Sequence, residues 1–201
     1  MKNSNTFVSR LRRGAPLFLF LLVPSLAQAH PAAPGHTHGL ANGFFHPLTG
    51  LDHLCAMVAV GLWATQRGGR ALWLVPATFV SVMVLGGILG MGGMPVPFIE
   101  QGIAASVLIL GIFIAAAVRL PVAASMSIVG LFALFHGYAH GAEMPETASG
   151  LNYAIGFVIA TASLHLAGIT LGLAAKKFTS AKSIRFAGGA IAACGLYLCI
   201  A

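Results

Sequence analysis

Six apolar runs, separated by short polar connections, occupy most of the chain after residue 46. Their bounds are Pro47–Thr65, Ala71–Leu89, Phe98–Val118, Pro121–His140, Leu151–Ala175 and Ile184–Ile200. Each run approaches the roughly 20 residues that a helix needs to cross a bilayer. None alternates between apolar and polar positions as the strands of an outer-membrane barrel do. The pattern predicts an all-α, polytopic helical membrane protein with six transmembrane helices.

The composition of the chain excludes an ordinary soluble domain. Of the 201 residues, 58% are hydrophobic and only 7% are charged, whereas soluble domains carry about 25% charged residues. The formal net charge is +7. The basic residues gather at the chain start and between the apolar runs, so we expect them to set membrane topology rather than to bind nucleic acid. The sequence holds no Walker A motif, and we expect no nucleotide partner.

The first 29 residues have the pattern of a secretory signal peptide. A basic stretch that ends at Arg13 is followed by a short apolar stretch, Pro16–Leu26, and then by Ala27-Gln28-Ala29, which has the A-x-A form of a cleavage site. The apolar stretch is too short to span a bilayer comfortably. We therefore expect residues 1–29 to be removed, which leaves a membrane domain of residues 30–201. The alternative is an uncleaved anchor.

Charges alternate from one connection to the next. The Lys and Arg residues after residue 29 all lie in the first, third and fifth connections: Arg67, Arg70, Arg119, Lys176, Lys177, Lys182 and Arg185. The charged residues of the second and fourth connections are all acidic: Glu100, Glu143 and Glu146. Because positive loops stay in the cytoplasm, the pattern predicts a bacterial inner-membrane protein whose mature N- and C-termini are both periplasmic.

The first polar cluster precedes and enters the first apolar run. Pro47 suits the first position of a helix, so we expect His46 to mark the helix start. His53, seven residues later, should lie on nearly the same face. Asp52 would either bind a metal directly or orient a histidine. Met57 follows one turn after His53 and offers a thioether, although plain packing is the more common role of such a methionine.

The second polar cluster ends the fourth apolar run. His136 and His140 are four residues apart and share one helical face. Glu143 continues that face if the helix reaches it. Imidazoles with few carboxylates suit borderline divalent metals. The predicted topology brings both clusters to the periplasmic side of the bilayer, so we expect one metal site to contain residues from each.

The remaining histidines have two interpretations each. His165 should lie about 20 Å below the outer end of the fifth run, either as a relay for the ion or as a packed residue bonded to a carbonyl. His36 and His38 belong to a polar tail that either collects metal or is simply solvated. His30 would become the new N-terminal residue, where either its imidazole and α-amine chelate a metal together or it has no role, because any residue can follow a cleavage site.

Glycines one turn apart recur in three of the runs. The pairs are Gly86 and Gly90, Gly137 and Gly141, and Gly168 and Gly172. Small residues at this spacing allow helix backbones to approach closely in a membrane. We expect these faces to be helix contacts.

Two long motifs give the chain a resemblance to a known family. His46-x5-Asp52-His53 lies within HPLTGLDHLCAM, and FHGYAHGAEMP covers residues 135–145. With the signal peptide and six further spans, the chain resembles the HupE/UreJ family of nickel/cobalt permeases. The resemblance implies secondary transport of Ni²⁺ or Co²⁺ for hydrogenase or urease maturation. It also implies six metal-site positions: His46, Asp52, His53, His136, His140 and Glu143.

The sequence therefore predicts a permease that imports Ni²⁺ or Co²⁺ as its substrate and carries no tightly bound cofactor. One rival class is an intramembrane zinc-dependent hydrolase, in which histidines and an aspartate hold Zn²⁺ and activate water. Another is an auxiliary subunit of a larger transporter, or a metal sensor. Metal uptake without hydrolytic activity would separate the permease from the hydrolase.

Overall fold

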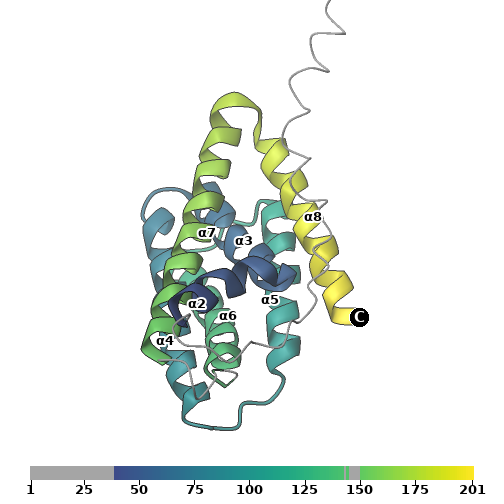
Figure 1. The fold of residues 1–201 in the computed structure, drawn as a ribbon. Coiled ribbons are helices and arrows are strands. Elements are labelled where there is room, and N and C mark those ends of the chain that lie inside the picture. The colour runs from purple at the N-terminus through teal and green to yellow at the C-terminus, as the bar shows by residue number, and fades with distance from the viewer. Residues whose placement is uncertain (1–38, 143, 145–149) are drawn as a thin grey trace, which may run out of the picture.

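The structure is a computed structural model that describes residues 39–142, 144 and 150–201 (Figure 1). In these residues every regular element is a helix. The seven helices are α2 (Gly39–Thr49), α3 (Leu51–Arg67), α4 (Ala71–Met91), α5 (Ile99–Ala116), α6 (Val122–Ala142), α7 (Gly150–Phe178) and α8 (Ala181–Ile200). The predicted signal peptide lies outside the described residues. So do four of the predicted or weighed site residues: His30, His36, His38 and Glu143.

Helices α4 to α8 are each long and apolar enough to cross a membrane. They correspond to the last five predicted runs, which the structure confirms. The first run differs, because α2 and α3 meet at an angle of 81° and pass as one span only if they are taken together. The protein is thus an all-helical membrane protein with five such helices in its described part, or six spans if the bent pair counts as one.

The bend lies at Gly50 and corrects the expectation for His46. Gly50 has φ −83° and ψ 120°, an extended conformation that interrupts the helix. His46 and Pro47 lie inside α2 rather than at the start of a single long helix. A Cβ atom at Gly50 would come within 2.7 Å of Asp52 Oδ1 and 3.1 Å of His53 Nδ1. A larger residue here would displace these two side chains, which fold back against the bend.

Glycines let the helix backbones approach one another closely, as predicted. A Cβ atom at Gly137 or Gly141 would collide with the backbone of α4, and one at Gly86 or Gly90 would collide with the backbone of α6. Gly168 of α7 lies in the same way against the backbone of α3. These contacts pair α4 with α6 and α3 with α7 within the helical bundle (Figure 1).

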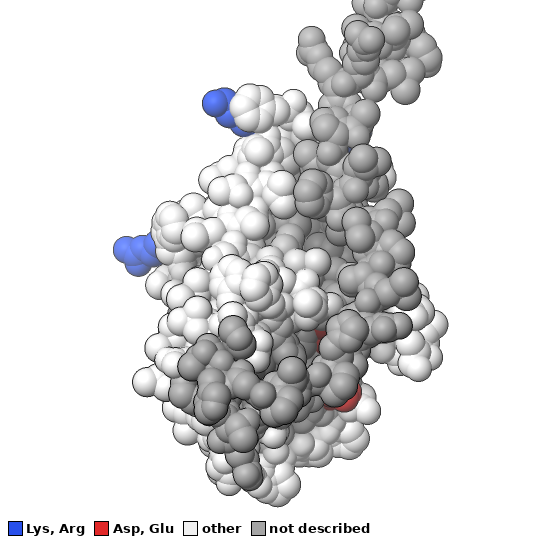
Figure 2. All heavy atoms as spheres, in the orientation of Figure 1, with Lys and Arg blue, Asp and Glu red and all other residues white. Residues whose placement is uncertain are grey.

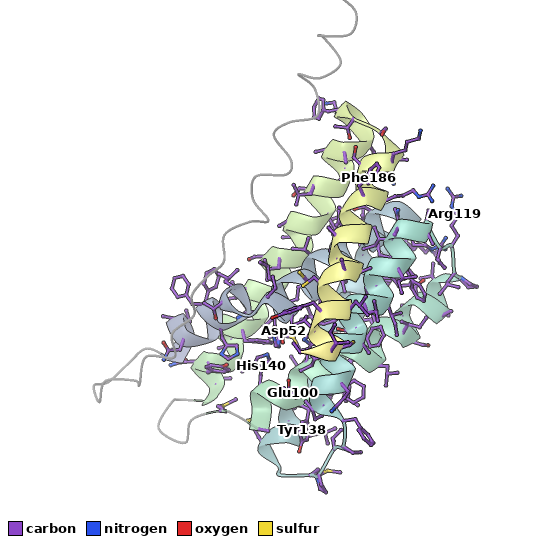
Figure 3. The ribbon with its side chains drawn as sticks, turned by 90° about the vertical axis from the view of Figure 1, so that its right-hand side faces the viewer. Asp52, Glu100, Arg119, Tyr138, His140 and Phe186 are labelled. Atoms are coloured by element: carbon purple, nitrogen blue, oxygen red, sulfur yellow. The ribbon has the colours of Figure 1, made fainter. Side chains whose placement is uncertain are left out.

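The charged side chains lie toward opposite ends of this bundle. Figure 2 shows Lys and Arg toward the top and upper left, and Asp and Glu only in the lower half. Figure 3 places Arg119 near the upper end, while Glu100 lies low in the view beside Asp52 and His140. The alternation of charge along the sequence therefore corresponds to a separation of charge in space.

Candidate metal centre

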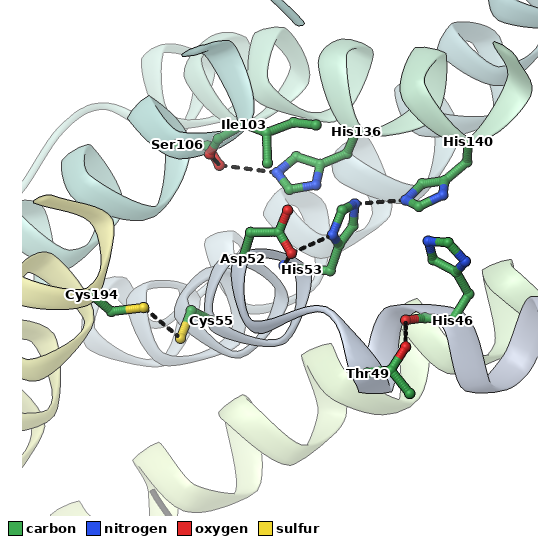
Figure 4. A network of polar contacts seen from close by, with 10 residues as sticks. All are labelled: His46, Thr49, Asp52, His53, Cys55, Ile103, Ser106, His136, His140 and Cys194. Carbon is green, nitrogen blue, oxygen red and sulfur yellow. Dashed lines mark hydrogen bonds and ion pairs between the residues drawn. The ribbon is translucent and has the colours of Figure 1, made fainter. Parts of the chain in front are cut away.

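Four imidazoles from three helices meet beside the bend. His46 comes from α2, His53 from α3, and His136 and His140 from α6; together they form the histidine cluster (Figure 4). The ring centroids are 4.5 Å apart for His53 and His140, 4.6 Å for His46 and His140, and 4.8 Å for His53 and His136. The structure thus brings the two predicted polar motifs together, although His53 and His140 are 87 residues apart in the chain.

The bend places His46 in this cluster. In an unbroken helix, residues seven apart would stack about 10 Å apart along the axis. Because the chain bends by 81° between α2 and α3, the rings are not stacked along one axis, and their centroids are only 6.1 Å apart. The same-face expectation was wrong in its geometry, since the two residues belong to different helices.

Asp52 orients the ring of His53. Its Oδ1 lies 2.7 Å from His53 Nδ1 and also accepts a hydrogen bond from the His53 backbone nitrogen at 2.7 Å. A carboxylate at this position holds the proton on Nδ1 and leaves Nε2 with a free lone pair. Of the two roles predicted for Asp52, orientation of a histidine is the one that this geometry supports.

The lone pair of His53 faces His140. The two Nε2 atoms are 2.6 Å apart in a buried contact. Since His53 holds its proton on Nδ1, His140 must donate from Nε2. His140 Nδ1 is then a lone-pair nitrogen, and it is buried without a hydrogen-bond partner among the described residues.

His136, one turn before His140 on α6, has a similar arrangement. Its Nε2 lies 3.0 Å from the hydroxyl of Ser106, which donates its own hydrogen to the carbonyl of Ile103 at 2.6 Å. Ser106 therefore accepts from His136 Nε2. The Nδ1 of His136 retains its lone pair and has no partner, in a side chain that is fully buried.

A cavity of about 250 Å³ opens beside these rings. Besides residues of the histidine cluster, its lining includes Asp52 and the exposed carboxylate of Glu100 from the first turn of α5. Sequence reasoning did not include Glu100 among the site residues, because it treated this acid only as part of a connection. Ser106 was missed as well, since one serine in an apolar run gives no distinguishing pattern.

In this arrangement the imidazole rings of His53 and His140 are too close together to share a metal ion. No three His, Cys, Asp or Glu side chains of the described part are positioned to hold a metal ion in common. Two nitrogens on one tetrahedral metal lie roughly 3.3 Å apart, given metal–nitrogen bonds of about 2.0 Å. The Nε2 atoms of His53 and His140, 2.6 Å apart, are closer than that. An ion that bound there would replace the shared proton and separate the rings by less than about 1 Å.

Two further predicted residues lie outside the histidine cluster. Met57 is fully buried in the hydrophobic core, which is the packing role. His165 is also buried, and its ring packs edge-on against Phe79 with centroids 5.1 Å apart. An aromatic side chain that sequence reasoning missed, Phe157, covers His140 with centroids 4.0 Å apart.

Comparison with known proteins identifies the family. The family described as HupE / UreJ protein matches residues 18–198. The chain is 44% identical over 182 residues to "Protein HupE" from Rhizobium leguminosarum bv. viciae, a match that covers 90% of this chain and 93% of the relative. No solved structure matches. A match of this length, together with helices that can span a membrane and two motifs that meet in one cluster, shows that the chain belongs to the HupE/UreJ family of membrane proteins.

Proposed function

We propose that the protein is a secondary transporter that imports Ni²⁺ or Co²⁺ across the bacterial inner membrane. The observation that carries the proposal is the histidine cluster, in which Asp52 orients His53 beside a cavity within a bundle of apolar helices. Ionisable groups are rare in membrane segments and usually mark a pathway for ions or protons. Membership of the HupE/UreJ family supports the proposal. In the proposed function, hydrogenase or urease is the enzyme that receives the metal.

The donor atoms favour a borderline transition metal. Imidazole nitrogens bind Ni²⁺, Co²⁺, Cu²⁺ and Zn²⁺ well, whereas Mg²⁺ and Ca²⁺ prefer sites built from oxygen. The histidine cluster offers nitrogens from four rings, and Asp52 and Glu100 are the only carboxylates that line the cavity in the described residues. The site therefore suits Ni²⁺ or Co²⁺ better than an alkaline-earth ion.

The predicted orientation and the membrane potential together favour inward movement of a cation. With the basic connections in the cytoplasm, the cavity opens toward the periplasm and Glu100 lies at its mouth. A membrane potential that is negative inside contributes about 2.3 kcal/mol per charge per 100 mV. A divalent ion gains twice that amount, so the potential alone can drive uptake. Protons compete with metal for imidazole nitrogens, and transport should weaken in acid.

The test is nickel uptake by the purified protein in liposomes with an imposed potential, negative inside. We expect uptake by the wild-type protein, and almost none by His53→Ala or His140→Ala when equal protein is inserted. Ser127→Ala is the matched control, because Ser127 is exposed on α6 and bonds only to the carbonyl of Ala123. Liposomes with wild-type protein that take up no more nickel than empty ones would refute the proposal. Metal-dependent peptide hydrolysis in its place would favour the zinc hydrolase.

A further inference from the structure

His165 is buried in the bundle with both ring nitrogens unsatisfied. Its residue is only 2% exposed. Neither Nδ1 nor Nε2 has a hydrogen-bond partner among the described residues. The sequence allowed a packed histidine that bonds to a carbonyl, and the structure forms no such bond. Burying an unsatisfied polar group costs free energy, so a residue kept only for packing would be better replaced by an apolar one.

One aromatic ring contacts both His165 and the histidine cluster. Phe79 of α4 packs edge-on against His165 with centroids 5.1 Å apart, and its ring centroid lies 5.7 Å from that of His136. His136 Nδ1 is itself a lone-pair nitrogen without a partner. Both imidazoles thus pack against Phe79, and each has a ring nitrogen without a hydrogen-bond partner among the described residues.

The buried face of α7 connects the two positions. Four residues spaced by one turn lie on this face, namely Tyr153, Phe157, Thr161 and His165, and all are buried. The first two contact rings of the histidine cluster. The Thr161 hydroxyl faces the thioether sulfur of Met83 on α4, 3.6 Å away. His165 lies one turn beyond Thr161, as Phe79 lies one turn before Met83 on α4. Polar and soft donor atoms therefore continue along this face past the histidine cluster.

We propose that His165 is a second, deeper binding position for the transported ion, which receives it from His136 and releases it toward the cytoplasmic end. The proposal rests on the function proposed above. An imidazole suits borderline divalent ions and disfavours Mg²⁺ and Ca²⁺. Phe79 packs against both imidazoles, so its ring borders the route by which an ion would pass between them. Capture takes place at the histidine cluster, and His165 lowers the barrier to the inward step.

The experiment compares His165→Phe with His165→Cys in liposomes that take up nickel. The phenylalanine keeps a buried ring and removes both nitrogens, whereas the cysteine restores a metal donor. We expect His165→Phe to lower Vmax by about tenfold or more while KM changes by less than about twofold, because capture is intact and only the later step is lost. We expect His165→Cys to recover much of Vmax. Ser163→Ala, exposed on the same helix, is the control.

Three results would overturn the proposal. They are near-wild-type uptake by His165→Phe, loss of metal binding in that variant to the extent seen in His53→Ala, and a cysteine variant no better than the phenylalanine. If His165→Phe does not reach the membrane, Co²⁺ titration of the wild-type protein followed by absorption decides: we expect a second bound ion, and saturation at a single ion overturns the proposal. Failure of the transport function itself is distinguishable, because the wild-type protein would then move no metal.

Discussion

A single carboxylate oxygen of Asp52 contacts His53 twice, at the ring nitrogen Nδ1 and at the backbone nitrogen, with both distances 2.7 Å. The residue that orients the ring is thus its own neighbour in the chain. Because the backbone contact fixes the carboxylate and the carboxylate fixes the ring, His53 Nε2 is directed at His140 before any ion arrives.

Asp52→Asn tests this orienting role. The amide keeps the size of the side chain but removes the charge that holds the proton on Nδ1. We expect metal affinity to fall about 10- to 100-fold, as is usual when the partner of a metal-binding histidine is changed. Isothermal titration of the detergent-solubilised protein measures this. Unchanged affinity would mean that Asp52 does not govern His53.

His53 and His140 should behave as one unit. Their Nε2 atoms face each other at 2.6 Å, so either single alanine variant already disables the shared position. In a double-mutant cycle on metal affinity, we expect the second substitution to add little, with a coupling of about 0.5–3 kcal/mol. His53 with His136 should show the same behaviour. Additive losses would indicate separate sites.

Gly50→Ala should damage the site without a change in any metal-binding side chain. The new Cβ would lie 2.7 Å from Asp52 Oδ1, so the carboxylate must shift away from His53. We expect a loss of about 1–3 kcal/mol in stability and a marked fall in nickel uptake. The control is Gly189→Ala on α8, where a Cβ has no atom within 4 Å. Equal uptake by both variants would contradict the assigned role of the bend.

Glu100→Gln should weaken capture of the ion and leave the later transport step nearly unchanged. Glu100 is exposed at the cavity, where its charge raises the local concentration of divalent ions. We expect KM for nickel to rise severalfold at low ionic strength, with little change in Vmax. The difference from wild type should shrink as salt screens the charge. A KM that is equal to the wild-type value in low salt would remove Glu100 from the pathway.

Reporter fusions test the orientation of the protein. Fusions after Arg70, Arg119 and Lys182 should report the cytoplasm. Fusions after Gly93 and Ser149, and at the C-terminus, should report the periplasm. The reason is the placement of basic residues in alternate connections. A cytoplasmic C-terminus would mean that the bent pair does not count as one crossing.

Long-range features of this fold were predictable from the sequence where they depend on composition and spacing. Apolar runs of membrane length predicted α4 to α8, and glycines such as Gly137 and Gly141 predicted backbone contact between helices. The meeting of His53 with His136 and His140 followed from helix direction and loop charge alone.

Features that depend on one backbone conformation were not predictable in the same way. Pro47 suggested a helix start, yet the interruption lies at Gly50. This position could not be predicted, because only the folded site shows how closely Asp52 and His53 approach Gly50. Helical spacing gave Asp52 two possible roles, and the hydrogen bond to Nδ1 was needed to favour one. Ser106 and Phe157 join the site through tertiary packing, which single-residue patterns do not encode.

The bend between α2 and α3 has an electrical consequence. With 17 residues, α3 rises about 25 Å, which is less than the roughly 30 Å of a hydrocarbon core. His53 lies in its first turn, so with the proposed orientation most of that rise still separates a captured ion from the cytoplasm. The greater part of the voltage drop then lies inward of the histidine cluster. The membrane potential would act weakly on capture and strongly on the inward step.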